Sequence, residues 1–213
     1  HRRLILPQLS GPGISAHGVI RRSGFSVAYG PIRAEDLPAY LDAGEKAMPD
    51  MRRKTFTMWE RTVLIPVELV AAVKPLLLIL PVLFLLGGLG ARKGFWAGAV
   101  HDGTFSVLAF LSAVFAGAVL NPVLLPWLPG RAFSTKGFSI GAVTALLVLW
   151  LRGWNWHSGP GVLESAAWLL IIPALAAYLA MNFTGCSTFT SLSGVRREMR
   201  WALPLEIGMA SCG

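Results

Sequence analysis

Charged residues are scarce in this chain. They make up 14% of its 213 residues, whereas soluble domains usually carry about 25%. Hydrophobic residues make up 54%, so the composition excludes an ordinary soluble protein and indicates a membrane protein. The net charge of +8 lies mainly next to apolar runs, which is typical of cytoplasmic loops. No basic stretch carries interleaved aromatic residues on a recognisable nucleic-acid-binding fold, so nucleic acid is not an expected partner.

Cysteine is also rare. Cys186 and Cys212 are the two cysteines of the sequence, and they form no C-x-x-C motif. This excludes a disulfide framework and a self-contained zinc or iron–sulfur site. The sequence shows no initiator methionine or signal peptide. Its last apolar segment stops after about 13 residues, where a spanning helix needs about 20, so we expect a fragment of a longer protein.

Residues 1–45 alternate between the periods of strands and helices. "LIL" at 4–6 is a buried-strand run, "SGPG" is a turn, and Ala16, Val19 and Ile20 follow helical spacing up to Gly24. "FSVAY" is a second strand, and "AEDLPAYLDAG" predicts a second helix that Asp36 can cap. The order β-α-β-α predicts a parallel sheet, and two strands alone are too few for a stable domain.

The rest of the chain predicts an all-α, multi-pass transmembrane domain over 62–213. A basic linker at 46–61 precedes it. Spanning helices are expected near 63–90, 104–126, 135–152 and 162–183, with a truncated fifth from 201. The third is the shortest, since 15 residues separate Lys136 from Arg152, so Lys136 would have to snorkel.

The distribution of Lys and Arg predicts the orientation. With the N-terminal side inside, the inner segments hold ten of these residues and the outer loops hold three, namely Arg92, Lys93 and Arg152. Most tryptophans fall at predicted helix ends, and Trp168 is the exception. We therefore expect an inner (cytoplasmic) membrane protein whose N-terminal domain is cytoplasmic.

Two loops follow the predicted strands, "QLSGPG" and "YGPIRAED". Both belong at the carboxyl edge of the sheet, where open α/β folds bind ligands. Glycines there let a flat or bulky ligand approach the main chain, and a helix N-terminus offers unpaired N–H groups. From pattern alone, ordinary βα turns explain the loops equally well. Neither matches a dinucleotide or Walker fingerprint.

The stretch "LILPQLSGPGISAHGVIRRSGFSVAYGPIRAEDLPAYLDAG" resembles the corrinoid-binding domain of the corrinoid iron–sulfur protein large subunit. Followed by several spanning helices, it most resembles the HgcA family of mercury-methylating corrinoid proteins, as does "MNFTGCSTFTSLSGVRREMR" before the last helix. The resemblance implies that residues 1–45 are the C-terminal part of a Rossmann-like corrinoid-binding domain. It assigns cobalamin binding to the two loops: Gln8, Leu9, Ser10, Gly11, Pro12, Gly13, Tyr29, Gly30, Pro31 and Arg33.

The implied activity is corrinoid-dependent methyl transfer to inorganic Hg(II), giving methylmercury. The implied partners are a ferredoxin-like iron–sulfur protein and a methyl donor such as methyltetrahydrofolate or its methyltransferase. The family places a lower-ligand cysteine in an "N-V-W-C-A-A-G-K" helix, which this sequence lacks. That cysteine is expected upstream, so this stretch alone is expected to be inactive.

Four further residues allow both a functional and a structural interpretation. Cys186 could offer a soft thiolate to Hg(II) or be a small buried cysteine. Glu68 and Glu206, in "IPVELV" and "LPLEIG", could be functional, or merely hydrated or hydrogen-bonded near the cytoplasmic helix ends. His17 lacks the D-x-H-x-x-G context of corrinoid-ligating histidines and is expected on a helix surface.

Two other functions remain open. The first is a membrane transporter or channel with a regulatory α/β domain. The second is a corrinoid methyl carrier of an acetyl-CoA-type pathway, against which the multi-span domain argues through the family resemblance.

Overall fold

The computed structural model describes residues 2–11, 13–53, 56–89, 94–153, 159–186 and 192–213. The chain divides into two compact units, His1–Phe56 and Thr57–Gly213. The division falls inside the segment 46–61 that was expected to be a linker. The side chains of residues 159–160, 184–186 and 192–193 lie outside the description.

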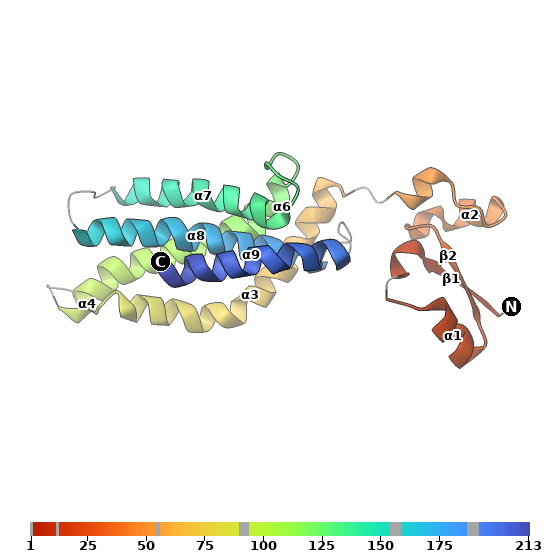
Figure 1. Cartoon of the computed structure of the whole chain (residues 1–213), viewed down its shortest axis with the longest axis horizontal. Coiled ribbons are helices and arrows are strands. Elements are labelled where there is room, and N and C mark those ends of the chain that lie inside the picture. Colours follow the sequence, from red (N-terminus) through yellow and green to blue (C-terminus); the bar gives the residue numbers. More distant parts are fainter. Residues whose placement is uncertain (1, 12, 54–55, 90–93, 154–158, 187–191) are drawn as a thin grey trace. The chain divides into compact units, whose positions relative to one another are not determined.

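The first unit is built on a two-stranded parallel sheet (Figure 1). Strand β1 (Arg3–Pro7) pairs with β2 (Ser26–Gly30), with Leu4 opposite Val27 and Pro7 opposite Gly30. Helix α1 (Ala16–Ser23) connects the strands, and α2 (Leu37–Asp42) follows β2. The predicted β-α-β-α order and parallel pairing are therefore confirmed.

Local signals in the sequence start and stop these helices. The Ser15 hydroxyl accepts a hydrogen bond from the N–H of Gly18 and caps α1, and Gly24 ends this helix at φ 70°. Asp36 stands at the N-cap position of α2, but its side chain makes no capping hydrogen bond. The expectation that Asp36 caps the helix is therefore wrong. A 3-10 turn, η2 (Ala34–Asp36), runs directly into α2 and leaves Asp36 with helical dihedrals.

Part of the expected linker packs inside the first unit. Residues Pro49–Arg52 form a 3-10 turn, η3. The backbone N–H of Ile32 donates to the carbonyl of Met51 over 3.1 Å, and the Met51 side chain is buried. Tyr40 is the other large apolar side chain buried in the described part of this unit. The core of the unit is therefore small, and it depends on residues beyond 45.

The second unit has four helical segments long and apolar enough to cross a membrane, so the expected number of complete spans is supported. The first is α3 (Met58–Leu86), the third is α7 (Phe133–Arg152), and the fourth lies within α8 (Gly159–Cys186). The second runs from Phe95 to Leu124. It consists of α4 (Phe95–Gly98), the π-helical turn η4 (Ala99–Gly103), α5 (Thr104–Phe115), a second π-helical turn η5 (Ala116–Leu120) and α6 (Asn121–Leu124).

Two of the expected helix boundaries are wrong. Helix α3 begins at Met58 rather than near 63, because Thr57 and Glu60 form a reciprocal capping box. The second span begins at Phe95 rather than near 104, so His101, Asp102 and Gly103 are helical. Glycine at position 103 lets this helical turn pack closely against the end of α3, because a Cβ there would collide with the carbonyl oxygen of Phe84.

An ion-pair network secures the same end of the bundle. One Arg152 nitrogen lies 2.8 Å from the Asp102 carboxylate and 2.9 Å from that of Glu164. The Arg152 guanidinium also lies 3.8 Å from the centre of the Phe105 ring. Phe105 meets Trp168 edge to face, and Trp168 is buried rather than interfacial, which explains its exception to the tryptophan pattern.

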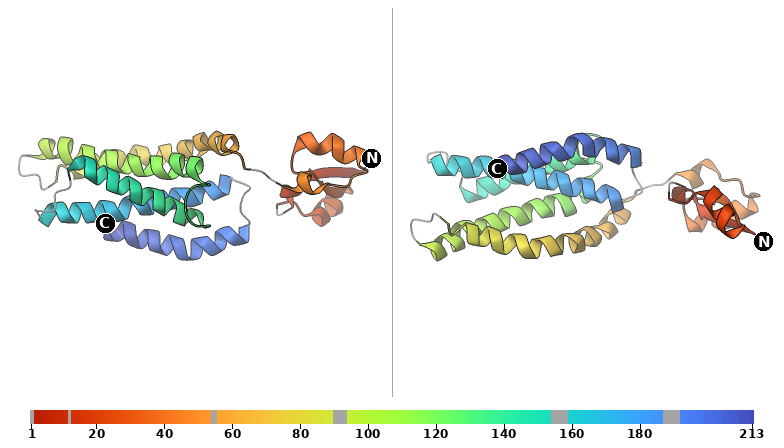
Figure 2. Two further views of the ribbon diagram at one scale, coloured as in Figure 1. Left: turned by 90° about the horizontal axis from the view of Figure 1, so that it is seen from above. Right: turned by 60° about the horizontal axis from the view of Figure 1, so that its bottom comes forward.

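Helix α8 packs closely against α7 through small residues (Figure 2). A Cβ on Gly141 would lie 2.7 Å from Cα of Pro173, and a Cβ on Gly137 would lie 2.6 Å from the carbonyl oxygen of Ala176. Side chains this small let the two backbones approach, which is a common way for helices to associate in lipid. Ala176 also packs against η5, so one face of α8 serves two neighbours.

Helix α9 (Leu192–Cys212) replaces the truncated fifth span expected from 201. It begins nine residues earlier than expected, because the charged stretch with Arg196, Arg197 and Arg200 is itself helical. Its apolar part, residues 201–212, is shorter than a complete span, so the expected truncated fifth span stays a prediction. It packs along α8 (Figure 2).

Two glycine-to-alanine changes should have opposite effects on stability. Gly141→Ala places a methyl group against the Pro173 backbone, so we expect it to destabilise the bundle by about 1–3 kcal/mol. Gly208→Ala, on an open face of α9, should stabilise by up to about 1 kcal/mol through helix propensity. Thermal unfolding of the detergent-purified variants measures both. Equal melting temperatures would contradict the tight α7–α8 contact.

Candidate functional site

The two loops expected to bind a ligand lie at one edge of the sheet. β1 ends at Pro7 and β2 ends at Gly30, and these residues are paired in the register. The 3-10 turn η1 (Gln8–Ser10) follows β1, and Pro31 follows β2. The parallel pairing thus brings the carboxyl ends of both strands together, as an α/β ligand edge requires.

Hydrogen bonds hold the first loop in a defined shape. The Tyr29 hydroxyl donates to the carbonyl of Ile14 over 2.6 Å, which ties the loop to the end of β2. The Ser10 hydroxyl donates to the carbonyl of Pro7 over 2.7 Å, and the N–H of Ile14 donates to the carbonyl of Ser10. Gln8, Leu9, Gly11 and Gly13 remain exposed. Pro12, also expected in the site, lies outside the described residues.

The three glycines of the expected site have different roles. A Cβ on Gly13 would lie 3.8 Å from the Ser10 carbonyl oxygen, the nearest atom among the described residues beyond its chain neighbours, so this backbone is open to a ligand. At Gly11 the nearest atom is the Gln8 carbonyl oxygen at 3.3 Å. At Gly30 a Cβ would lie 2.7 Å from Cγ2 of Ile5. Packing inside the unit therefore accounts for a glycine at this position, and its part in a ligand site stays a prediction.

Pro31 and Arg33 lie in different surroundings. Pro31 is buried. Arg33 lines a surface cavity of about 640 Å³ formed by charged and apolar residues, namely Asp36, Ala39, Met48, Asp50, Met51 and Arg53. Among the described residues expected in the site, Arg33 thus belongs to a cavity beside α2, whereas Gln8, Leu9, Gly11 and Gly13 lie in the turn at the sheet edge.

The sheet edge fits contact with one side of a flat ring. Leu9, Ile14 and Tyr29 are 37–40% exposed and give it an apolar surface, while Gly13 leaves its backbone accessible. Among the described residues no cluster of three or more His, Cys, Asp or Glu residues occurs that could hold a free metal ion, and His17 is exposed on α1. The edge thus suits a flat organic ring better than a bare metal ion.

Cys186 is the last residue of α8, and its side chain lies outside the description. The proposal that it meets Hg(II) therefore stays a prediction. Cys212 is an exposed free cysteine on α9.

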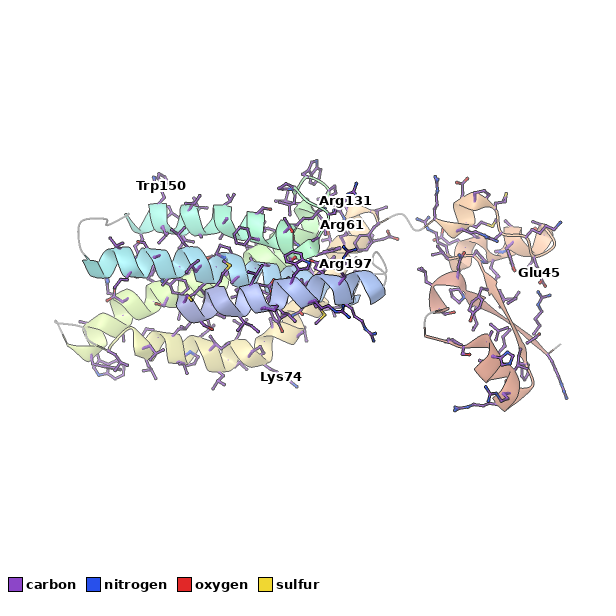
Figure 3. The ribbon with its side chains drawn as sticks, viewed as in Figure 1. Glu45, Arg61, Lys74, Arg131, Trp150 and Arg197 are labelled. Carbon is purple, nitrogen blue, oxygen red and sulfur yellow. The ribbon has the colours of Figure 1, made fainter. Side chains whose placement is uncertain are left out.

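Glu68 and Glu206 lie several turns from the starts of their helices. Glu68 is the eleventh residue of α3, and Glu206 is the fifteenth of α9. At 1.5 Å per residue these positions are about 15 and 21 Å from the helix starts. Each side chain is 7% exposed, so hydration alone does not account for either carboxylate, and a functional role for them stays a prediction. Lys74 is exposed and extends away from the other helices (Figure 3), so it faces different surroundings from Glu68.

Each glutamate borders a cavity. Glu68 lines one of about 290 Å³ between α3, α5 and α8, together with Tyr178 and Asn182. Glu206 lines a cavity of about 240 Å³ beside α7 and another of about 440 Å³ beside α5. Within the described part of the chain, neither carboxylate oxygen of Glu206 has a hydrogen-bond partner.

Two cations satisfy the carbonyl groups at the end of α6. Arg61 is 4% exposed, and its guanidinium donates to the carbonyls of Pro122 (3.2 Å) and Val123 (3.4 Å) (Figure 3). The Lys136 ammonium donates to the carbonyl of Leu125 over 2.6 Å. Positive charge suits the carboxyl end of a helix. The sequence had assigned Arg61 to the linker, and only the position of α6 reveals its role.

Tyr29→Phe should loosen the glycine loop without unfolding the sheet. It removes the hydroxyl that holds Ile14, a contact worth about 1 kcal/mol, so amide exchange in residues 9–14 should quicken about fivefold. Exchange in β2 should not change. Hydrogen–deuterium exchange of the full-length protein measures this, with His17→Ala on exposed α1 as the control. Unchanged loop exchange would mean that the hydroxyl does not hold the turn.

Comparison of this chain with models of protein families, with curated proteins and with solved structures returned no match. These comparisons therefore show neither a family nor a function. Information on the function therefore comes from the residues at the sheet edge, from the membrane helices and from the sequence resemblance already described.

Proposed function

We propose that this chain is part of a membrane-anchored, corrinoid-dependent methyltransferase whose methyl acceptor is Hg(II). The observation that carries the proposal is the sheet edge, where two βα loops with an accessible glycine meet at the ends of parallel strands. The four apolar helices that follow match the second half of the resemblance. Together they support a Rossmann-like domain for the first unit.

The residues of the edge have simple roles in this proposal. A corrinoid bound at this edge supplies a methyl group carried on cobalt. Leu9, Ile14 and the Tyr29 ring contact its apolar side and exclude water, and the Tyr29 hydroxyl keeps the loop open at Gly13. The lower axial ligand is assigned to a cysteine outside this sequence. Electrons come from the ferredoxin-like partner, and the methyl group comes from a donor such as methyltetrahydrofolate or its methyltransferase.

The proposed location is the inner (cytoplasmic) membrane, with the α/β unit in the cytoplasm. Ten Lys and Arg residues flank the spans on the side of Thr57, compared with three on the opposite side. This distribution supports a cytoplasmic sheet edge, in the compartment that holds soluble methyl donors and iron–sulfur proteins.

A transporter or channel is the second candidate. The observation in its favour is the burial of Glu68 and Glu206 beside cavities of the bundle, because ionisable groups inside membrane domains often mark a substrate path. A methyl carrier for acetyl-CoA synthesis would keep the same corrinoid edge with a different acceptor. Methylmercury production by the full-length protein separates these functions: transport without methylation would support the second candidate.

Gly13→Val should reduce corrinoid retention by the full-length protein at least tenfold. The branched side chain occupies the open space beside the loop. Its Cβ lies 3.8 Å from the nearest described atom, the Ser10 carbonyl oxygen, so the loop itself can accommodate it. Gly18→Val, where a Cβ makes ordinary contacts with Ser15, is the matched control and should retain the cofactor. Cobalt content per purified protein measures the difference. Full cobalt content in Gly13→Val would show that the loop is only a connector.

Cys186→Ala distinguishes a mercury-binding thiol from a packed one. If the thiolate positions Hg(II), methylmercury formation should fall while bound corrinoid stays constant. If the thiol is only packed, the change should cost about 1 kcal/mol of stability and leave the methyl-transfer rate unchanged. Cys212→Ala, at an exposed position, is the control. An unchanged rate would remove Cys186 from the site.

A further inference from the structure

The cavity of about 440 Å³ between α5, α8 and α9 combines one carboxylate with apolar walls. Two aromatic side chains, Phe110 and Tyr178, lie on one side, and Glu206 lies on α9. The other walls are aliphatic: Ile171, Ala174, Leu175, Leu203, Ile207 and Ala210. A volume of a few hundred cubic ångströms, mostly apolar with one well-placed polar group, is typical of small-molecule sites.

The carboxylate of Glu206 lacks a counter-charge in the part of the chain that the structure describes. The side chain is 7% exposed, and both its oxygens are buried without a hydrogen-bond partner there. The charge that acts on it from α9 is Glu198, just over two turns earlier, which has the same sign. Glu198 is itself engaged, since it accepts a hydrogen bond from the N–H of Ser134. A buried ionised carboxylate is costly unless something positive joins it.

The aromatic rings point to the same kind of ligand. Phe110, Leu175 and Tyr178 also line the cavity of Glu68, so these side chains stand between two buried carboxylates. The face of an aromatic ring attracts a cation, most strongly where water is excluded. Aliphatic walls meanwhile favour a ligand whose charge is surrounded by hydrocarbon.

Other occupants satisfy fewer of these features. A divalent metal ion needs several oxygen ligands, and the described residues hold no cluster of metal-ligating groups here. An anion would be repelled by Glu206. A neutral lipid chain would fill the apolar volume but leave the carboxylate unpaired.

We propose that this cavity binds a hydrophobic organic cation. Glu206 neutralises the positive charge, and Phe110, Tyr178 and the aliphatic walls contact the apolar groups. The site lies wholly in the second unit and is independent of the proposed methyl transfer.

Binding of radiolabelled tetraphenylphosphonium to the full chain in nanodiscs tests this proposal. We expect saturable binding that tetraphenylborate, which has the same shape and the opposite charge, does not displace. Glu206→Gln should weaken the affinity at least tenfold. Glu164→Gln is the matched control, since Glu164 lies outside the cavity and Arg152 keeps its contact with Asp102.

A second variant keeps the charge and removes the space. Ala210→Trp places a large side chain on the cavity wall and should abolish binding while leaving Glu206 in place. The proposal is overturned if tetraphenylphosphonium does not bind, if tetraphenylborate binds equally well, or if both variants bind like the wild type. A carboxyl that is simply protonated and filled over by lipid would give the first of these results.

Discussion

The close contact between α7 and α8 is the constraint on which the membrane unit depends. Lipid provides no hydrophobic drive for two apolar helices to associate, so they associate through van der Waals contact at short range. Gly137 and Gly141 permit that range, because any side chain there would meet the backbone of α8 near Pro173 and Ala176. With this face of α8 committed to α7, its remaining surface is available to α5 and α9. The cavity of Glu206 lies between those helices and α8.

Two of the scarce charged side chains lie beside backbone carbonyl groups that need hydrogen-bond donors. A helix end inside a membrane domain leaves carbonyl groups without partners, and each costs free energy if water cannot reach it. Arg61 and Lys136 meet this need at the end of α6, and both come from neighbouring helices. These long side chains also tie α3 and α7 to the second span. Glu206 does not follow this pattern, because it meets no complementary group among the described residues.

The sequence predicted the features that depend on local chemistry. Strand and helix periods, with Ser15 and Gly24 as helix signals, were enough for the β-α-β-α order, and long apolar runs were enough for four spans. What it missed depends on contacts between segments far apart in the chain. No sequence pattern places Ile5 beside Gly30. The burial of Glu68 and Glu206 was also missed, because it depends on the early starts of α3 and α9 and on the packing of both helices.

The two candidate sites were therefore unequally accessible to sequence reasoning. The sheet edge follows from topology, since parallel strands must end together and the loops after them must be neighbours. The cavity of Glu206 follows from packing, and its walls come from α5, α8 and α9, which the sequence separates by up to 100 residues, from Phe110 to Ala210. What the sequence did show was a carboxylate in an apolar segment. Such a residue costs free energy while it is ionised, and either protonation or a positively charged ligand removes that cost.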